Sequence, residues 1–183
     1  MMAEVEANSV QPGDIQCVVI QPGHLHLTRT PSILQTILGS CVGVTFWCAR
    51  LGAGALCHGV LPRCPRGTGV PDGYRYVDFS IRYLAEQFDA LGASRYELEV
   101  KLFGGADVLP VSAARAHRAT VGALNCRAAR EVLEEEGLSV LASDLGGIRG
   151  RTIRFDSGTG EVLLQRLQAL NGHPAKAHRR SSL

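Results

Sequence analysis

The order of the predicted strands and helices is the feature that most limits the fold of this chain. Three runs rich in β-branched or aliphatic residues, at 15–20, 42–47 and 55–61, follow one another with no helical pattern between them. A doubly wound parallel sheet requires a helix between consecutive strands. The sequence therefore predicts an α+β fold.

Two helices and four further strands complete the prediction. Apolar residues at three- and four-residue steps predict a helix over 77–91 that stops at Gly92, and a similar stripe predicts a second helix over 124–133. The other predicted strands lie at 98–102, 138–142, 152–155 and 161–167, and a turn at 156–160 joins the last two as a hairpin.

The length and charge of the chain suit one ordinary domain. The sequence has 183 residues, 20% of them charged, and a net charge of +2. We expect a flexible N-terminus at 1–13, a single domain at 14–170 and a flexible basic C-terminal tail at 171–183. The basic cluster in that tail is interpreted as a solvated terminus, so no nucleic-acid partner is expected.

The chain lacks the features of a secreted or membrane-inserted protein. Its N-terminus carries no basic start followed by an apolar stretch, and no apolar run approaches the ~18 residues of a membrane span. We therefore expect a cytoplasmic location without membrane insertion. The six cysteines should then be free thiols.

Cys41 and His58 form the pair of residues that most suggests chemistry. A four-residue hairpin loop at 48–51 would place them directly opposite one another, with Cβ atoms about 4.5–5.5 Å apart. A register shift by one facing pair would make them diagonal neighbours on the same face of the sheet. Either arrangement would let the imidazole take the thiol proton, leaving a thiolate beside an imidazolium.

A structural interpretation of this pair stays open at this point. Cys41 could be a small apolar filler at the start of a strand, and His58 a hydrogen-bonded core histidine. The preceding Gly39 and Ser40 favour chemistry, because a small turn-forming pair can expose the sulfur and direct backbone N–H groups at a developing oxyanion.

No metal site is expected. Cys57 adjoins His58, but neighbouring strand residues point to opposite faces, and the sequence has no Cys-x-x-Cys pair. The glycine-rich turns at 103–107 and 144–151 are neither phosphate loops nor dinucleotide-binding turns. As plain loops they would be ordinary. The remaining histidines are interpreted as surface or local structural residues: His24, His26, His117, His173 and His178.

Six ordered motifs together resemble those of the chemoreceptor glutamine deamidase family, CheD. They lie at 38–42, at the strand ending Leu61-Pro62, and at 76–78, 103–107, 121–125 and 144–151. The resemblance covers about residues 14 to 168. It implies a layered α/β fold with mixed β-sheets packed together and helices outside, akin to bacterial toxin deamidases.

The resemblance also implies an activity and its residues. Glutamine side chains of methyl-accepting chemotaxis receptors would be hydrolysed to glutamate with release of ammonia. We expect the reaction to pass through a cysteine thioester and to need no cofactor. The nucleophile falls on Cys41 and the base on His58, and the family's polar third residue is carried onto Thr36. A CheC-type chemotaxis phosphatase is an implied partner.

Further roles are assigned around this pair. Gly39 and Ser40 are expected to bind the substrate, with backbone N–H groups near Ser40 and Cys41 holding the oxyanion, and the loop containing Phe103, Gly104 and Gly105 would line the cleft. Two alternatives to a deamidase are a non-catalytic adaptor that binds a receptor or phosphatase, and a cysteine protease or esterase that uses the same pair.

Overall fold

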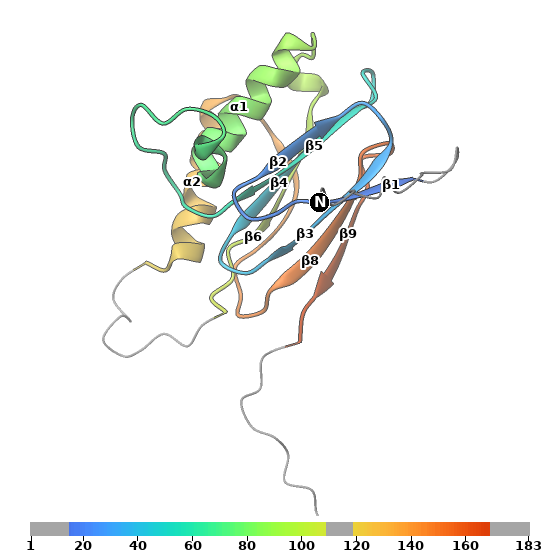
Figure 1. Cartoon of the computed structure of the whole chain (residues 1–183). Coiled ribbons are helices and arrows are strands. Elements are labelled where there is room, and N and C mark those ends of the chain that lie inside the picture. Colours follow the sequence, from blue (N-terminus) through green and yellow to red (C-terminus); the bar gives the residue numbers. More distant parts are fainter. Residues whose placement is uncertain (1–14, 109–118, 169–183) are drawn as a thin grey trace, which may run out of the picture.

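The computed structural model describes residues 15–108 and 119–168, which form three layers (Figure 1). A four-stranded sheet of order β1-β3-β8-β9 packs against a five-stranded sheet of order β2-β5-β4-β6-β7, and helices α1 and α2 cover the other face of the five-stranded sheet. The α+β class and the layered arrangement are therefore confirmed. The predicted termini at 1–13 and 171–183 lie outside the described residues.

The strands are β1 Gln16–Val19, β2 Leu25–Thr28, β3 Ser32–Leu38, β4 Val42–Cys48, β5 Ala53–Gly59, β6 Glu99–Gly104, β7 Val140–Leu145, β8 Arg151–Asp156 and β9 Val162–Arg166. The helices are α1 Val77–Ala90 and α2 Val121–Glu135, with short 3-10 turns at Asp72–Arg75 and Arg95–Glu97. Both sheets are mixed, because β1 runs parallel to β3 and β7 parallel to β6 while the other pairs are antiparallel. The predicted β8–β9 hairpin is present.

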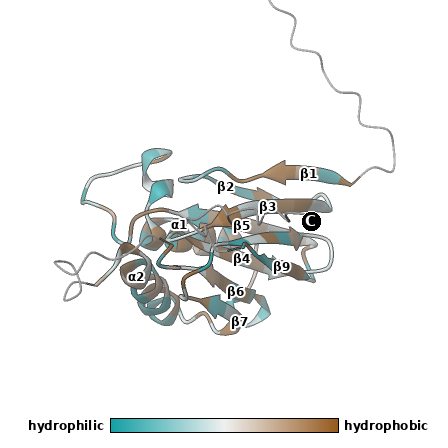
Figure 2. Ribbon diagram, turned by 90° about the horizontal axis from the view of Figure 1, so that it is seen from below, coloured by the Kyte–Doolittle hydropathy of each residue, from teal (hydrophilic) through white to brown (hydrophobic). Residues whose placement is uncertain are grey.

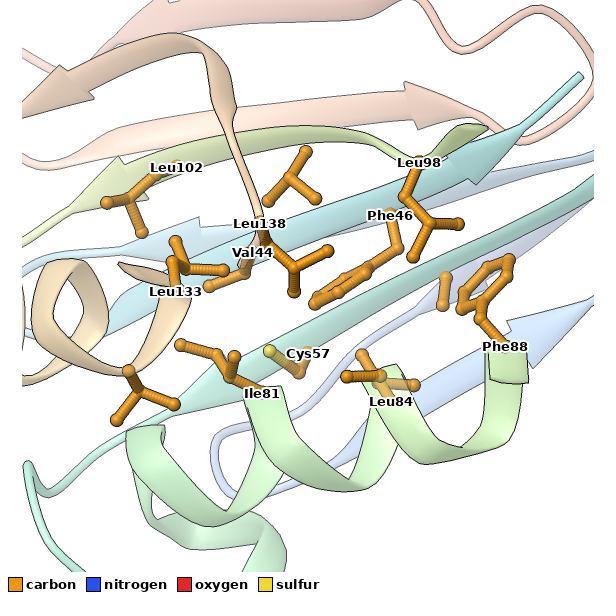
Figure 3. Close-up of a cluster of buried hydrophobic side chains, with 14 of the residues drawn as sticks. Val44, Phe46, Cys57, Ile81, Leu84, Phe88, Leu98, Leu102, Leu133 and Leu138 are labelled. Carbon is orange, nitrogen blue, oxygen red and sulfur yellow. The ribbon is translucent and has the colours of Figure 1, made fainter. Parts of the chain in front are cut away.

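Alternating residues of the central strand β4 face two different cores. Val44 and Phe46 point toward the helices and pack with residues such as Ile81 and Phe88 of α1 (Figure 3). Cys57 of β5 lies in this same core, so it faces away from the four-stranded sheet. Helix α2 covers the same core with Val132 and Leu133, so it has one hydrophobic and one hydrophilic side (Figure 2).

The second core fills the space between the two sheets. It contains Leu34, Leu38, Leu56, Phe103, Ile153 and Phe155, with Cys41 and Trp47 packed at its margin. Strand β3 contributes Leu34 and Leu38 to this core, and its polar Thr36 points the same way because strand side chains alternate. Thr36 therefore projects from the four-stranded sheet into the space between the sheets, beside residues of the five-stranded sheet.

Two strands were missed by the sequence prediction, β2 and β3. In β3 the buried positions include the polar Ser32 and Thr36, whereas the outward Ile37 is exposed. The apolar and polar residues therefore do not alternate in the way that identifies a half-buried strand. Neither described helix is long and apolar enough to cross a membrane.

Candidate active site

Cys41 lies at the corner where the chain passes from one sheet to the other. Strand β3 ends in the four-stranded sheet at Leu38, a turn follows at 39–41, and β4 enters the five-stranded sheet at Val42. The Cys41 side chain is half-buried at the edge of the inter-sheet core. The thiol is thus placed by two strands that belong to different sheets.

His58 is a diagonal neighbour of Cys41, not its direct partner. The facing pairs of β4 and β5 include Gly43 with His58 and Cys48 with Ala53, which corrects the predicted register by one facing pair. The hairpin loop is 49–52, because Gly52 takes a φ of +56° and donates its N–H to the Ala49 carbonyl. Since Cys41 and Gly43 are two residues apart, Cys41 and His58 share the face directed at the other sheet.

Thr36 reaches His58 across the inter-sheet space. Its hydroxyl lies 2.7 Å from the Ile20 carbonyl oxygen, to which it donates, and 2.7 Å from Nδ1 of His58. Because the hydroxyl proton is committed to Ile20, the threonine oxygen accepts from Nδ1–H. The proton of the neutral ring is therefore on Nδ1, and Nε2 carries a free lone pair.

That Nε2 atom is buried without a hydrogen-bond partner in the described part of the chain. His58 is only 1% exposed. The pKa of His58 is lowered to about 4, mainly by burial; the Ile20 carbonyl acts in the opposite direction, and the nearby His24 adds to the lowering. At neutral pH the imidazole is an uncharged base with an available nitrogen.

The Cys41 thiol is also uncharged at rest. Burial raises its pKa, and its own backbone N–H partly offsets this effect. The thiolate beside an imidazolium, which the sequence suggested, is therefore not the form that this environment favours in the absence of substrate. Both groups are desolvated, and desolvation disfavours the charged form of each.

The turn that carries Cys41 is held by three consecutive carbonyl groups. Gly39 O accepts from Ala106 N at 2.8 Å, and Cys41 O accepts from Gly105 N at 2.8 Å. Ser40 O accepts from the side chain of Asn125, at 2.9 Å from Nδ2. By contrast, the N–H groups of Ser40 and Cys41 donate to no other residue within 15–108 and 119–168.

The Phe103–Gly105 segment lies behind this turn. Phe103 is buried in the inter-sheet core, and a Cβ on Gly104 would come within 2.2 Å of the Cys41 carbonyl oxygen. The buried Arg151 donates to the carbonyl of Gly104 at 3.2 Å and to Asp144 Oδ1 at 2.6 Å. The structure thus gives these glycines a supporting position beneath Cys41, and their role in substrate binding stays a prediction.

Asn125 and Arg151 received no role from the sequence. Both belong to motifs that the resemblance singled out, at 121–125 and 144–151, so the motifs were the available signal. The contacts of Asn125 with Ser40 and Val60, and of Arg151 with Gly104, join residues far apart in the chain. Within the described residues, no group of three or more His, Cys, Asp or Glu side chains could hold a metal ion.

The family model and the relatives by sequence agree on one family. The family described as "CheD chemotactic sensory transduction" matches residues 60–166, more than half of the chain, in a segment that begins just after His58. A "Probable chemoreceptor glutamine deamidase CheD 2" of Geobacter sulfurreducens is 46% identical over 82% of this chain and 89% of its own length. A "Probable chemoreceptor glutamine deamidase CheD" of Maridesulfovibrio salexigens is 38% identical over 85% and 94%. Among solved structures, the hypothetical protein YfiH of Bacillus licheniformis has a TM-score of 0.43 at 12% identity, covering 65% of this chain and 49% of that one.

Proposed function

Because the chain belongs to the CheD family, we propose that it is a protein-glutamine glutaminase that converts glutamine side chains of methyl-accepting chemotaxis receptors to glutamate. Its relatives are named as chemoreceptor glutamine deamidases and are aligned over most of both chains. Such a reaction needs a nucleophile, a base and an oxyanion site. Each can be assigned to residues at the corner between the two sheets.

One observation supports the proposal most: an imidazole whose tautomer is fixed and whose free nitrogen is buried. Thr36 holds the Nδ1–H of His58, and Nε2 has no partner among the described residues. A purely structural buried histidine would be expected to satisfy both nitrogens. Cys41 lies on the same sheet face as His58, and no hydrogen bond joins its sulfur to Nε2 in the described residues. This shared face, with a lone pair left free, supports the assignment of the two residues as nucleophile and base.

The first half of the proposed reaction forms a thioester. Sγ of Cys41 attacks the γ-carboxamide carbon of the glutamine as His58 Nε2 accepts the thiol proton. The carbonyl oxygen becomes an oxyanion, which the N–H groups of Ser40 and Cys41 bind. The imidazolium then gives its proton to the amide nitrogen, the C–N bond breaks, and ammonia leaves.

The second half hydrolyses the thioester. Water attacks the thioester carbon while His58 Nε2 accepts one of its protons, and the C–S bond breaks to give glutamate. The imidazolium returns its proton to the Cys41 sulfur, so the enzyme is restored. The carboxylic acid released gives up its proton, so that overall the glutamine and one water give glutamate and one ammonium ion. Thr36 keeps Nδ1 as the protonated nitrogen throughout, so that Nε2 serves both steps.

The neutral resting forms of Cys41 and His58 determine when the proton moves between them. Because burial keeps Cys41 as a thiol and His58 as a neutral imidazole, the proton moves only as the substrate carbonyl is attacked. The thiolate then forms where the oxyanion donors lie. We propose that this protects the half-buried sulfur from solution electrophiles between turnovers.

The finer assignments remain part of the proposal. These are the cytoplasmic location, the partnership with a CheC-type phosphatase, and the substrate contacts of Phe103, Gly104 and Gly105.

An adaptor without activity would bind the same partners but would not need a free Nε2 on the same face as a thiol. A protease or esterase would use the pair on peptide or ester bonds, and it is distinguished by its products.

Mass spectrometry of a receptor cytoplasmic domain incubated with the protein tests the function. Wild type should convert specific glutamines to glutamate, seen as a gain of about one dalton each, with release of ammonia. His58→Ala should lose about 10²–10⁴-fold of the rate, as expected for removal of a general base. Cys41→Ala should give no conversion, and conversion by that variant would rule out the assignment.

A further inference from the structure

Asn125 of helix α2 connects the segments that carry the two reacting groups. Its Nδ2 lies 2.9 Å from the carbonyl oxygen of Ser40 and 3.0 Å from that of Val60. Ser40 precedes the nucleophile Cys41, and Val60 follows the strand that carries His58. With both of its N–H groups the amide thus donates to each side of the Cys–His pair.

The orientation of this amide follows from its surroundings. Both neighbours of the nitrogen are carbonyl oxygens, which only accept hydrogen bonds, so the NH₂ group must face them. Asn125 is 0% exposed, and its Oδ1 is buried without a partner in the described part of the chain. An apolar residue would avoid the cost of that unpaired oxygen. The contribution of the asparagine therefore lies in its two donors.

The first of these donors controls the direction of a backbone N–H. In a trans peptide the C=O of one residue and the N–H of the next point in opposite directions. Asn125 draws the Ser40 carbonyl toward α2, so the Cys41 N–H is directed away from the helix. That N–H also lies at the Cys41 sulfur, where it lowers the thiol pKa. It is thus placed where the oxyanion would form.

The second donor fixes the separation of the two strands. Extending the register by one pair beyond Val42 and Gly59 places Val60 opposite Cys41. Strand β4 begins only at Val42, so Cys41 lies outside the β4–β5 hydrogen-bond ladder, where the chain is still turning from the four-stranded sheet. The Asn125 bridge holds this open end of the ladder together beside His58.

We propose that Asn125 is a positioning residue, which aims the Cys41 N–H at the oxyanion and holds together the two segments that carry the nucleophile and its base. This inference rests on the proposed deamidase function and deepens it. Asn125 touches neither the substrate nor the reacting atoms. Its removal should therefore lower kcat more than it raises KM, since the oxyanion develops only after the thiol attacks and is absent from the bound substrate.

The test compares two Asn125 variants with a matched control on the same helix. Asn125→Leu has a similar size and no donor, and Asn125→Ala serves if leucine prevents folding. The control is Val132→Thr, which buries a hydroxyl in the core between α2 and the five-stranded sheet without contacting the turn at 39–41. Unfolding by denaturant shows whether the variant and the control lose similar stability.

The steady-state rate of receptor deamidation is the first readout. Loss of a direct oxyanion donor costs about 10²–10³-fold in kcat, so loss of a residue that positions one should cost about 10- to 100-fold. KM should change less than about threefold, and the Val132→Thr control should keep the wild-type kcat. A kcat reduced equally in the variant and the control would show that Asn125 acts through stability alone and overturn the inference.

A second readout does not depend on deamidation. A receptor peptide whose glutamine carboxamide is replaced by an aldehyde should add to Cys41, forming an S–C bond while the carbonyl oxygen takes up the thiol proton. The affinity for this peptide should fall about tenfold or more in the Asn125 variants and stay unchanged in the control. Unchanged affinity in the variants would also overturn the inference. Failure of the wild type to deamidate receptors would instead remove the proposed function, which this binding assay separates from the role of Asn125.

Discussion

At the scale of single residues, one buried histidine combines two properties that usually exclude each other. It is almost fully buried, yet one of its ring nitrogens has no partner in the described part of the chain. Leaving a buried polar atom unpaired costs stability, of order 1–3 kcal/mol. The unpaired Nε2 of His58 is explained if it is kept available for the thiol proton of Cys41. The site therefore gives up some stability to hold a base ready.

The buried histidine should make the fold sensitive to acid. The pKa of His58 is lowered to about 4 in the folded protein, against the ordinary 6.5 of an exposed histidine. Between these values the unfolded chain binds a proton that the folded protein does not, so the free energy of unfolding decreases as the pH falls from 6.5 to about 4. This one group should contribute about 1.4 kcal/mol per pH unit.

Denaturant unfolding at several pH values checks this expectation. The wild type should lose stability steadily below pH 6.5, and His58→Gln should lose less over the same interval because it has no proton to bind. The same slope in both proteins would show that His58 is not buried in its neutral form.

At the scale of elements, the turn at 39–41 depends on what lies beneath it. The Gly104–Gly105 segment donates to the Cys41 carbonyl and is itself held by Arg151. Gly104 has a φ of +113°, and a Cβ there would meet the Cys41 carbonyl oxygen at 2.2 Å. The close approach of two backbone segments, not only the turn, thus requires glycine at this position.

Gly104→Ala should therefore displace Cys41 and reduce deamidation. We expect a loss of at least tenfold in kcat, since small misplacements of a nucleophile are costly. Gly137→Ala is the matched control, because Gly137 also has a positive φ, of +67°, but nothing lies within 4 Å of an added Cβ. Both variants should lose stability from backbone strain, and only Gly104→Ala should lose most of its activity. Equal activities would argue against the packing role of Gly104.

At the scale of the whole molecule, the site draws on three layers. The four-stranded sheet supplies Thr36, the five-stranded sheet supplies His58, and Cys41 lies at the corner between them. Helix α2 adds Asn125 from the opposite side of the five-stranded sheet. Separation of the two sheets would therefore break the Thr36–His58 hydrogen bond before it disturbed either sheet internally.

Local patterns predicted much of this architecture but not the contacts between layers. The helical stripe identified α1, and the hairpin turn identified β8 and β9, because each of these signals is contained in one stretch of about 20 residues. The face shared by Cys41 and His58 followed from strand alternation, which a shift by one facing pair does not alter. Gly52 changed the register because its left-handed conformation moved the loop by one residue.

The remaining site contacts could not be read from spacing. Thr36 was assigned through resemblance alone, and its bond to His58 crosses between two sheets. Strand β3, which carries Thr36, was not predicted because the polar Ser32 and Thr36 point inward while Ile37 points outward. The Asn125 contact joins residues 85 positions apart. Such contacts depend on how the layers pack, which the periodicity of one segment does not specify.

Covalent labelling at a single sulfur tests the central claim most directly. A receptor peptide in which a chloromethyl ketone replaces the glutamine carboxamide presents its electrophilic carbon where the amide would lie. Peptide mapping by mass spectrometry should find the adduct on Cys41 and not on the other five cysteines, and His58→Ala should slow its formation. An adduct on another cysteine, or one whose rate on Cys41 is independent of His58, would contradict the account.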